Sequence, residues 1–377
     1  MELFRNISPA YYSAIYCCFI FILCLLSAMR YLSSAGTTLL YAKKEIPFFT
    51  FAVGLMLILF LGLRPLNVAF GDSGMYAHVY NNFSDHYSTV DWQEEWLWAR
   101  LRSWCQLMGF SVNAYFLIIE ALYIGLMFLC CWMLFPNNVW VSFLFCLASF
   151  SFYGYAVNGL RNGLACSIML ATFPLVTKTK LKFFIGFFLC VLAVGVHRST
   201  LLPALALFMA LFLIKEPKYA IWFWIASIFI SLFVGNYVGD FFAGLGFDDR
   251  MTDYFQSQDD AKVMKQFSET GFRFDFLLYS AMPVLMTWYV TIKRNFEDRT
   301  FNIIAVTYIL ANAFWVMVIR AAYSNRFAYL SWFLYPIVIV YPLLRFRLWD
   351  DQDRKTALIL LLYEGFTFIM FLLGQSR

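Results

Sequence analysis

Residues 155–175 read YAVNGLRNGLACSIMLATFPL. From Leu164 onward this stretch is almost wholly apolar, as in a helix that spans a membrane. The polar residues at its head are Asn158, Arg161 and Asn162, set beside Gly159 and Gly163. A charged side chain near the centre of a bilayer costs about 2.5–3.5 kcal/mol on insertion scales, and such residues are usually functional. The guanidinium of Arg161, at the head of an apolar helix, therefore points to a function that the rest of the sequence can help to identify.

The chain as a whole is too apolar for a soluble protein. Of its 377 residues, 62% are hydrophobic, 21% are aromatic and only 14% are charged. A soluble domain is roughly 45–50% apolar and about 25% charged. The composition predicts an all-α, polytopic integral membrane protein with one transmembrane domain over residues 1–377. The nine cysteines include no CxxC pair, so neither a metal site nor a disulfide framework is indicated.

Twelve segments have the apolarity of a membrane span, which needs roughly 20 residues. They are residues 11–29, 46–63, 112–134, 138–157, 160–177, 181–197, 199–214, 219–238, 274–292, 300–319, 327–344 and 356–374. The first has no basic stretch before it and no small-residue cleavage site after it, so we interpret it as a retained span and not as a signal peptide. Two longer connections remain, residues 64–111 and 239–273.

The distribution of lysine predicts the orientation. With these spans, one set of loops and adjoining span ends holds nine lysines (including Lys182) and seven acids, and the other holds two lysines and fourteen acids (including Asp275). Basic residues favour the cytoplasmic side of a membrane. Both termini and both longer connections are therefore expected outside. The residues placed at this outer side include Arg64, Asp72, Arg161, His197, Arg198, Arg273, Asp275, Arg320 and Arg326.

Arginine at the outer side points to an anion. A guanidinium keeps its charge, and its planar fork matches the oxygens of phosphate or carboxylate. At Arg161 the free N–H groups of a helix N-terminus favour an anion further, and Asn158 is placed to cap that helix. The alternative is an arginine whose charged head reaches the interface merely as an anchor.

Two other polar stretches provide candidate bases. Residues 194–203 read VGVHRSTLLP, and His197 can accept or donate a proton near neutral pH. Alternatively, His197 lies in a turn whose polar residues merely face water. Residues 62–80 read GLRPLNVAFGDSGMYAHVY, in which Asp72 precedes a short helix that carries Tyr76. Asp72 is alternatively the cap of that helix. Residues 92–109 then predict an amphipathic helix in the membrane interface, with an apolar stripe of Leu97, Leu101, Trp104 and Met108.

Two stretches near the C-terminus complete the set. Residues 269–283 carry Arg273 and Asp275, and residues 318–330 carry Arg320 and Arg326. Each of these residues is alternatively an interfacial anchor or a member of an ion pair. Five or six arginines on one face of the membrane, with few lysines, favour a shared role.

Together these motifs resemble the EpsG/Wzy-type polysaccharide (O-antigen) polymerase family. The motifs are GLR before GDSGMY, GLRNGLA before VHRS, and SNRFAYL, and they span roughly residues 60–335. Arg161, His197 and Ser199 match the family pattern, whereas Asn162 stands where glutamine is usual. The resemblance implies a GT-C-like membrane glycosyltransferase in the bacterial cytoplasmic (inner) membrane, with its active site facing the periplasm.

The resemblance also implies a reaction. A growing glycan on undecaprenyl diphosphate is the donor, and a single repeat on the same lipid is the acceptor. Arginines would hold the diphosphate leaving group, and His197 or Asp72 would be the base, with no cofactor and no metal. The diphosphate-binding candidates are Arg64, Arg161, Arg273, Arg320 and Arg326; the glycan-binding or supporting candidates are Asn158, Asn162, Tyr76 and Asp275. Implied partners are a chain-length regulator and a flippase, and no nucleic acid.

Three alternatives remain open at this stage. A ligase would use the same donor with a different acceptor. A flippase or other transporter also suits twelve spans, but it usually places polar groups near the bilayer midplane. Within the predicted spans the isolated acids are Glu120 and Glu364, and a third acid, Asp275, lies at the outer end of the span 274–292. A scaffold without catalytic activity would leave the arginines unexplained.

Overall fold

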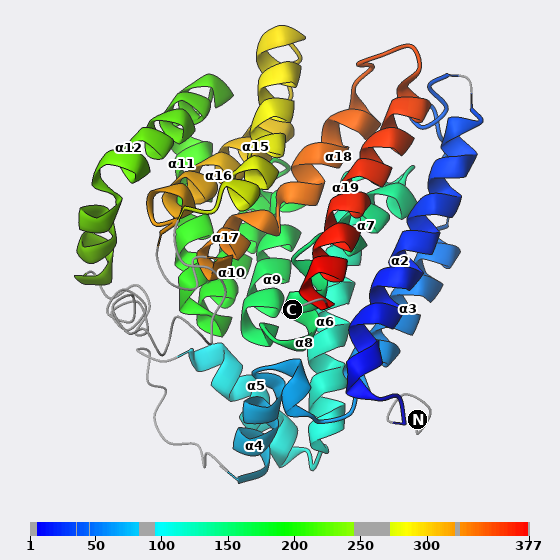
Figure 1. The fold of residues 1–377 in the computed structure, drawn as a ribbon, viewed down its shortest axis with the longest axis vertical. Helices are drawn as coiled ribbons and strands as arrows, with labels where there is room; N and C mark the ends of the chain where they lie inside the picture. The colour runs from blue at the N-terminus through cyan, green and yellow to red at the C-terminus, as the bar shows by residue number, and fades with distance from the viewer. Residues whose placement is uncertain are drawn as a thin grey trace. The chain divides into compact units, whose positions relative to one another are not determined.

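The computed structural model describes residues 6–34, 36–44, 46–82, 95–244, 272–320 and 325–375. Every regular element in these ranges is helical, so the all-α prediction is confirmed (Figure 1). The chain divides into two compact units. Unit 1 comprises Met1–His197 and Leu343–Arg377, and unit 2 comprises Arg198–Pro342.

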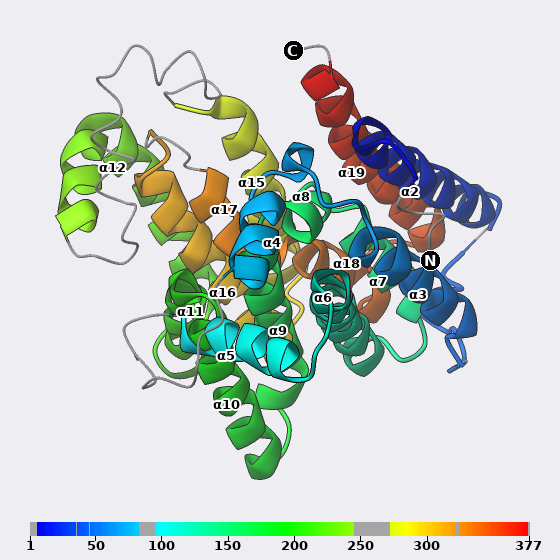
Figure 2. The ribbon, with the colours of Figure 1, turned by 90° about the horizontal axis from the view of Figure 1, so that it is seen from below.

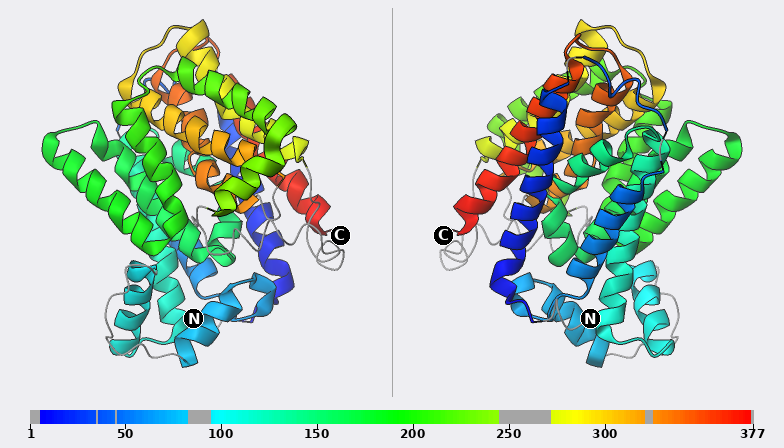
Figure 3. Two further views of the ribbon diagram at one scale, coloured as in Figure 1. Left: turned by 90° about the vertical axis from the view of Figure 1, so that its left-hand side faces the viewer. Right: turned by 90° about the vertical axis from the view of Figure 1, so that its right-hand side faces the viewer.

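Unit 1 is built around long apolar helices. Its helices are α2 (Pro9–Leu32), α3 (Phe48–Gly62), α4 (Ser73–Asn82), α5 (Trp96–Leu107), α6 (Val112–Leu134), α7 (Val139–Leu147), α8 (Phe152–Val157), α9 (Leu160–Val176), α10 (Lys180–Val196) and α19 (Gln352–Gln375). Helix α2 runs beside α19 although the two lie at opposite ends of the sequence (Figure 3, right). Helix α9 packs against both α6 and α10, and its residues after Asn162 are nearly all buried.

Helix ends follow local sequence signals. Ser111 precedes α6, and its hydroxyl accepts a hydrogen bond from the Ala114 N–H at 3.3 Å. Thr179 caps α10 in the same way through the Lys182 N–H, at 3.4 Å. Such side chains satisfy N–H groups that have no acceptor within the helix. The two helices therefore begin where their sequences place a hydroxyl.

The predicted span 138–157 is interrupted. It forms two helices, α7 and α8, of nine and six residues. Between them the hydroxyls of Ser149 and Ser151 are hydrogen-bonded at 3.0 Å. Serine side chains compete with the helical backbone for hydrogen bonds, which favours a break at this position. Neither helix reaches a bilayer thickness, because a helix rises only about 1.5 Å per residue.

Unit 2 is organised around the buried helix α16. Its helices are α11 (Leu201–Phe212), α12 (Pro217–Gly244), α15 (Phe274–Trp288) with a π-helical turn (Tyr289–Lys293), α16 (Arg299–Met317), α17 (Asn325–Trp332) and α18 (Tyr335–Arg345), the last of which ends in unit 1. Asn312 of α16 accepts from Trp224 Nε1 at 2.7 Å and donates to Ser331 Oγ at 3.0 Å. These bonds satisfy a polar amide inside an apolar helix contact.

Twelve membrane spans are not confirmed. In the described ranges, six segments are long and apolar enough to cross a membrane: Pro9–Leu32, Val112–Leu134, Phe274–Lys293, Arg299–Met317, Arg326–Arg345 and Gln352–Gly374. Four shorter apolar helices accompany them: Phe48–Gly62, Leu160–Val176, Arg198–Phe212 and Pro217–Phe233. The sequence pattern counts apolar runs, but breaks such as that at Ser149 and the early end of α11 shorten several of them. The chain remains a multi-pass membrane protein by these helices.

The two longer connections have different outcomes. Residues 64–111 contain a short 3₁₀ turn, α4 and the predicted amphipathic helix, α5. Of residues 239–273, the first six continue α12, and most of the rest lies outside the described residues. Side chains of the first connection can therefore be assigned to a site, whereas most of the second lies outside the described residues.

Candidate functional site

Helices α4 and α5 lie at one end of unit 1, across the ends of its longer helices (Figure 2). The apolar stripe of α5 is exposed at Trp104 and Met108, as expected for a helix that contacts lipid. Its other face turns into the protein. Trp98 is buried there against the rings of Tyr76 and Tyr115.

Arg161, at the first turn of α9, is held by this end of the molecule. Its Nε donates to the Tyr76 hydroxyl at 2.9 Å, and its guanidinium lies 5.5 Å from the centre of the Tyr76 ring. Burial raises the pKa of the Tyr76 hydroxyl, which therefore stays neutral as it accepts this bond. Arg161 Nη1 forms an ion pair with Glu95. The side chain is 24% exposed, so solvent reaches the guanidinium.

Glu95 joins Arg161 to His197. One carboxylate oxygen, Oε2, binds Arg161, and the other, Oε1, binds Nδ1 of His197. Burial raises the pKa of the Glu95 carboxyl, but its interactions with His197 and Arg161 outweigh this effect, so the pKa lies below its ordinary value. Tyr76, Glu95, Arg161 and His197 are called the Glu95 cluster below.

A close helix contact brings Glu95 to His197. Helix α10 ends at Val196, and His197 follows in an extended conformation with its N–H bonded to the Ala193 carbonyl at 3.0 Å. Gly195 in the last turn of α10 faces the Trp96 ring, and a Cβ at Gly195 would lie 2.6 Å from Trp96 Cε2. Glycine therefore lets α5 approach the end of α10, which sets Glu95 beside His197.

Asp72 lies at the start of α4 and is tied to the start of α9. Its backbone N–H donates to Asn158 Oδ1 at 2.8 Å. Gly71, before it, has a φ of +61°, and a Cβ there would meet Asn158 Oδ1 at 2.3 Å. Asn158 is thus a clamp on the Gly71–Asp72 turn and does not cap α9, whose N-cap is Gly159. The half-buried Asp72 carboxylate accepts no hydrogen bond within the described ranges.

Asn162, one residue after Arg161, turns along its own helix. Its Oδ1 accepts from the Cys166 thiol one turn later, at 3.3 Å. Its amide is half-buried. Asn162 is therefore next to Arg161 of the Glu95 cluster in the sequence, but its side chain is bonded within α9.

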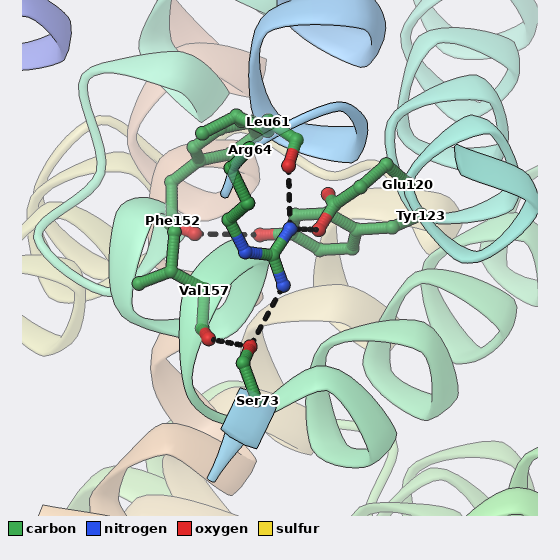
Figure 4. A network of polar contacts seen from close by, with 7 residues as sticks. All are labelled: Leu61, Arg64, Ser73, Glu120, Tyr123, Phe152 and Val157. Atoms are coloured by element: carbon green, nitrogen blue, oxygen red, sulfur yellow. Dashed lines mark hydrogen bonds and ion pairs between the residues drawn. The ribbon is translucent and has the colours of Figure 1, made fainter. Parts of the chain in front are cut away.

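Arg64 lies in a separate, buried network (Figure 4). Its guanidinium donates to Glu120 Oε1 of α6 at 3.1 Å, to the Leu61 carbonyl at 2.5 Å and to Ser73 Oγ at 2.8 Å. The Ser73 hydroxyl donates in turn to the Val157 carbonyl at 2.5 Å. Arg64 and Glu120 are 1% and 0% exposed. This Arg64 network ties the end of α3 to α4, α6 and α8, and Arg64 is not at the surface.

The remaining predicted residues belong to unit 2. Arg273 precedes α15, pairs with Asp275 at 2.6 Å and lies 3.9 Å from the centre of the Phe276 ring. Arg320 lies in the connection between α16 and α17, Arg326 is the second residue of α17, and both are half-buried. Within the described ranges, no three His, Cys, Asp or Glu side chains are grouped so that they could hold a metal ion.

Comparison with known proteins identifies the family. The model of the EpsG family matches residues 47–376. The chain belongs to the EpsG family. No curated protein sequence and no solved structure matches it. Membership of the EpsG family fits polysaccharide biosynthesis and suggests a polysaccharide polymerase-like membrane protein.

In this EpsG-family chain, the sequence did not identify two acids, Glu95 and Glu120, as partners of arginine. Glu95 reads as one polar residue of an amphipathic helix, and Glu120 reads as an isolated acid in a span. An available signal was the cost of a charge in a span, which requires a partner for Glu120. Nothing local indicates which arginine each acid meets, because Glu120 is 56 residues from Arg64 and Glu95 is 66 residues from Arg161.

Proposed function

We propose that this protein polymerises a surface polysaccharide such as O-antigen by joining oligosaccharide repeats carried on undecaprenyl diphosphate. The reaction occurs at the outer face of the bacterial cytoplasmic membrane, in a GT-C-like architecture. The Glu95 cluster is the observation that carries the proposal. It sets a partly exposed arginine and an imidazole on one carboxylate, in a membrane protein of the EpsG family.

The proposed reaction is a displacement at the anomeric carbon of the donor. A hydroxyl oxygen of the acceptor sugar forms the new C–O bond, and the bond from that carbon to the diphosphate breaks. The bonding electron pair leaves with undecaprenyl diphosphate. The hydroxyl proton passes to His197 and then to water. The leaving group is already ionised, so it needs positive charge more than it needs a proton.

Arg161 provides that charge. Its fork matches two diphosphate oxygens, and the first N–H groups of α9 have no acceptor within the helix. Fixed donors of this kind stabilise charge that develops on a leaving oxygen. Tyr76, which binds Arg161 Nε, orients the guanidinium. Asn158 holds the turn that carries Asp72, the second candidate base.

The other candidates have different proposed roles. The burial of Arg64 favours a structural role over contact with the diphosphate. Arg273, Asp275, Arg320 and Arg326 stay candidates for substrate binding by unit 2, and Asn162 for support of α9. Each is tested by its own alanine variant.

The test is a polymerisation assay with purified protein and lipid-linked repeats. Arg161→Ala is expected to abolish polymer, and Arg161→Lys is expected to restore it only in part, because lysine keeps the charge but loses the fork. Arg347→Ala is the matched control, since Arg347 pairs with Asp350 and is 62% exposed. Excess EDTA should not change the wild-type rate. Full-length polymer from Arg161→Ala at normal protein level would refute the proposal, as would transport of single repeats without their joining.

The orientation is tested separately by thiol labelling in a cysteine-free background. Asn81→Cys, at the exposed end of α4, is expected to react with an impermeant reagent added outside. Lys180→Cys, at the start of α10, is expected to resist it, because lysine-rich loops favour the cytoplasm. The reverse pattern would place the Glu95 cluster on the cytoplasmic side.

A further inference from the structure

Glu95 divides its two oxygens between two groups with different proposed tasks. Oε2 binds Arg161, the proposed diphosphate ligand, and Oε1 binds His197, the proposed base. The carboxylate is 16% exposed, so water and ligands reach the cluster. A single acid thus pairs with both functional residues.

A carboxylate and a phosphate compete for the same guanidinium positions. Both are oxyanions that accept charge-assisted hydrogen bonds from the arginine fork. Glu95 therefore occupies on Arg161 a place that the diphosphate must take. A donor that binds Arg161 displaces at least part of this ion pair, and the negative charge of Glu95 opposes its binding.

The bond to His197 sets the tautomer of the imidazole. Because Nδ1 faces a carboxylate, it carries the proton, and the basic lone pair is on Nε2. A carboxylate on Nδ1 also stabilises the imidazolium that forms when Nε2 accepts a proton. This effect strengthens when the carboxylate no longer shares its charge with an arginine.

We propose that Glu95 is a positioning residue that couples donor binding to the strength of the base. In the structure Glu95 is shared by Arg161 and His197; when the diphosphate occupies Arg161, Glu95 serves His197 alone. This inference rests on the proposed function, since it assigns the diphosphate and the base. Through this coupling, the base is strongest when a donor is bound.

The attachment of α5 suits this role. Trp96 lies against Gly195 of α10, and Trp98 is buried against Tyr76 and Tyr115. The first turn of α5, directly after Glu95, is therefore held by contacts with α10, α4 and α6. The exchange of partners needs only a rotation of the Glu95 side chain, with the backbone of α5 in place.

Glu95→Gln is expected to change donor binding and turnover in opposite directions. Glu95→Gln removes the charge that competes for Arg161, so farnesyl diphosphate in detergent should bind about 2- to 5-fold more tightly, as expected for the loss of a partly exposed charge. The same variant should polymerise at least about 10-fold more slowly, because an amide does not stabilise an imidazolium. Glu95→Asp keeps the charge and should restore part of the turnover.

Controls separate this result from a general loss of structure. Glu216→Gln removes an exposed glutamate that pairs with Lys218 and should change neither quantity. Farnesol should bind wild type and Glu95→Gln alike. A Glu95→Gln protein that binds farnesyl diphosphate no more tightly than wild type, or that polymerises at the wild-type rate, would overturn the inference.

Failure of the proposed function gives a different pattern. A wild-type protein that binds farnesyl diphosphate but makes no polymer would refute the polymerase. In that case the affinity of Glu95→Gln still shows whether Glu95 competes for Arg161.

Discussion

The Arg64 network and the Glu95 cluster use the same pair of residue types in different surroundings. In the first, Arg64 and Glu120 are 1% and 0% exposed and are surrounded by helices α3, α4, α6 and α8. In the second, Arg161 and Glu95 are 24% and 16% exposed and meet an imidazole. The sequence placed both arginines among diphosphate-binding candidates, and burial separates them.

Burial determines how costly it is to separate a charged pair. A buried pair is costly to break, because removal of one partner leaves an unpaired charge away from water. A partly exposed pair exchanges partners at lower cost, because water solvates the released group. Helix α4 connects the two regions, since Ser73 binds Arg64 and Tyr76 binds Arg161 one turn later. The Arg64 network therefore holds the helix that presents Tyr76 to Arg161.

The largest expected effect is the loss of folded protein in Arg64→Ala. The variant leaves Glu120 buried without its cation, which costs about 3–5 kcal/mol in comparable buried pairs. Arg161→Ala should keep its thermal midpoint within a few degrees of wild type, because its partners are partly solvated. Yield and thermal unfolding in detergent measure both. Equal losses in the two variants would remove the distinction between the regions.

A double variant sharpens this result. Arg64→Met with Glu120→Leu removes both charges and fills similar volume, and such replacements are often neutral or stabilising. The double variant should therefore recover most of the stability that Arg64→Ala loses. Stability as low as in the single variant would mean that Arg64 acts mainly through Ser73 and Leu61.

Loss of the base comes next. His197→Ala should polymerise about 10²–10⁴-fold more slowly, the usual cost of removing a general base. Its affinity for farnesyl diphosphate should persist, because Arg161 remains. Turnover and binding are measured on the same preparation. A fully active His197→Ala beside an inactive Asp72→Asn would transfer the base to Asp72.

A smaller effect is expected from the contact that carries α5. Gly195→Ala introduces a Cβ at 2.6 Å from Trp96, whereas Gly125→Ala in α6 meets nothing within 4 Å. Overpacking typically costs about 1–3 kcal/mol, and here it displaces the helix that bears Glu95. Gly195→Ala should therefore lower polymerisation while Gly125→Ala does not. Equal activities would show that the placement of Glu95 tolerates movement of α5.

The smallest effect is the pH dependence of stability. The pKa of Glu95 is lowered from 4.5, so its stabilising contribution is present above pH 4.5 and is lost as the pH falls through the lower folded-state pKa. Wild type should therefore unfold at a higher temperature than Glu95→Gln near neutral pH, and the gap should narrow below pH 4.5. A gap that is constant with pH would show that Glu95 stabilises by packing and not by charge.

Part of the site followed from local sequence. The run of residues 155–175 predicted a helix with Arg161 at its head, and α9 begins at Leu160. The sequence also predicted an amphipathic helix after residue 95, and α5 is present with Trp104 and Met108 of its apolar stripe exposed. These features depend on periodicity and on polar residues at helix ends, which neighbouring residues determine.

An all-helical membrane protein and its family can be recognised from the amino-acid sequence, because composition, apolar runs and short motifs are local or additive properties. The burial of Arg64 against Glu120, and the sharing of Glu95 by Arg161 and His197, become visible only in the folded molecule. The same holds for the division of the run at 138–157 into two helices. The reason is physical: exposure and pairing of a charge depend on residues dozens of positions away, brought close by helix packing, and a linear pattern does not contain those distances.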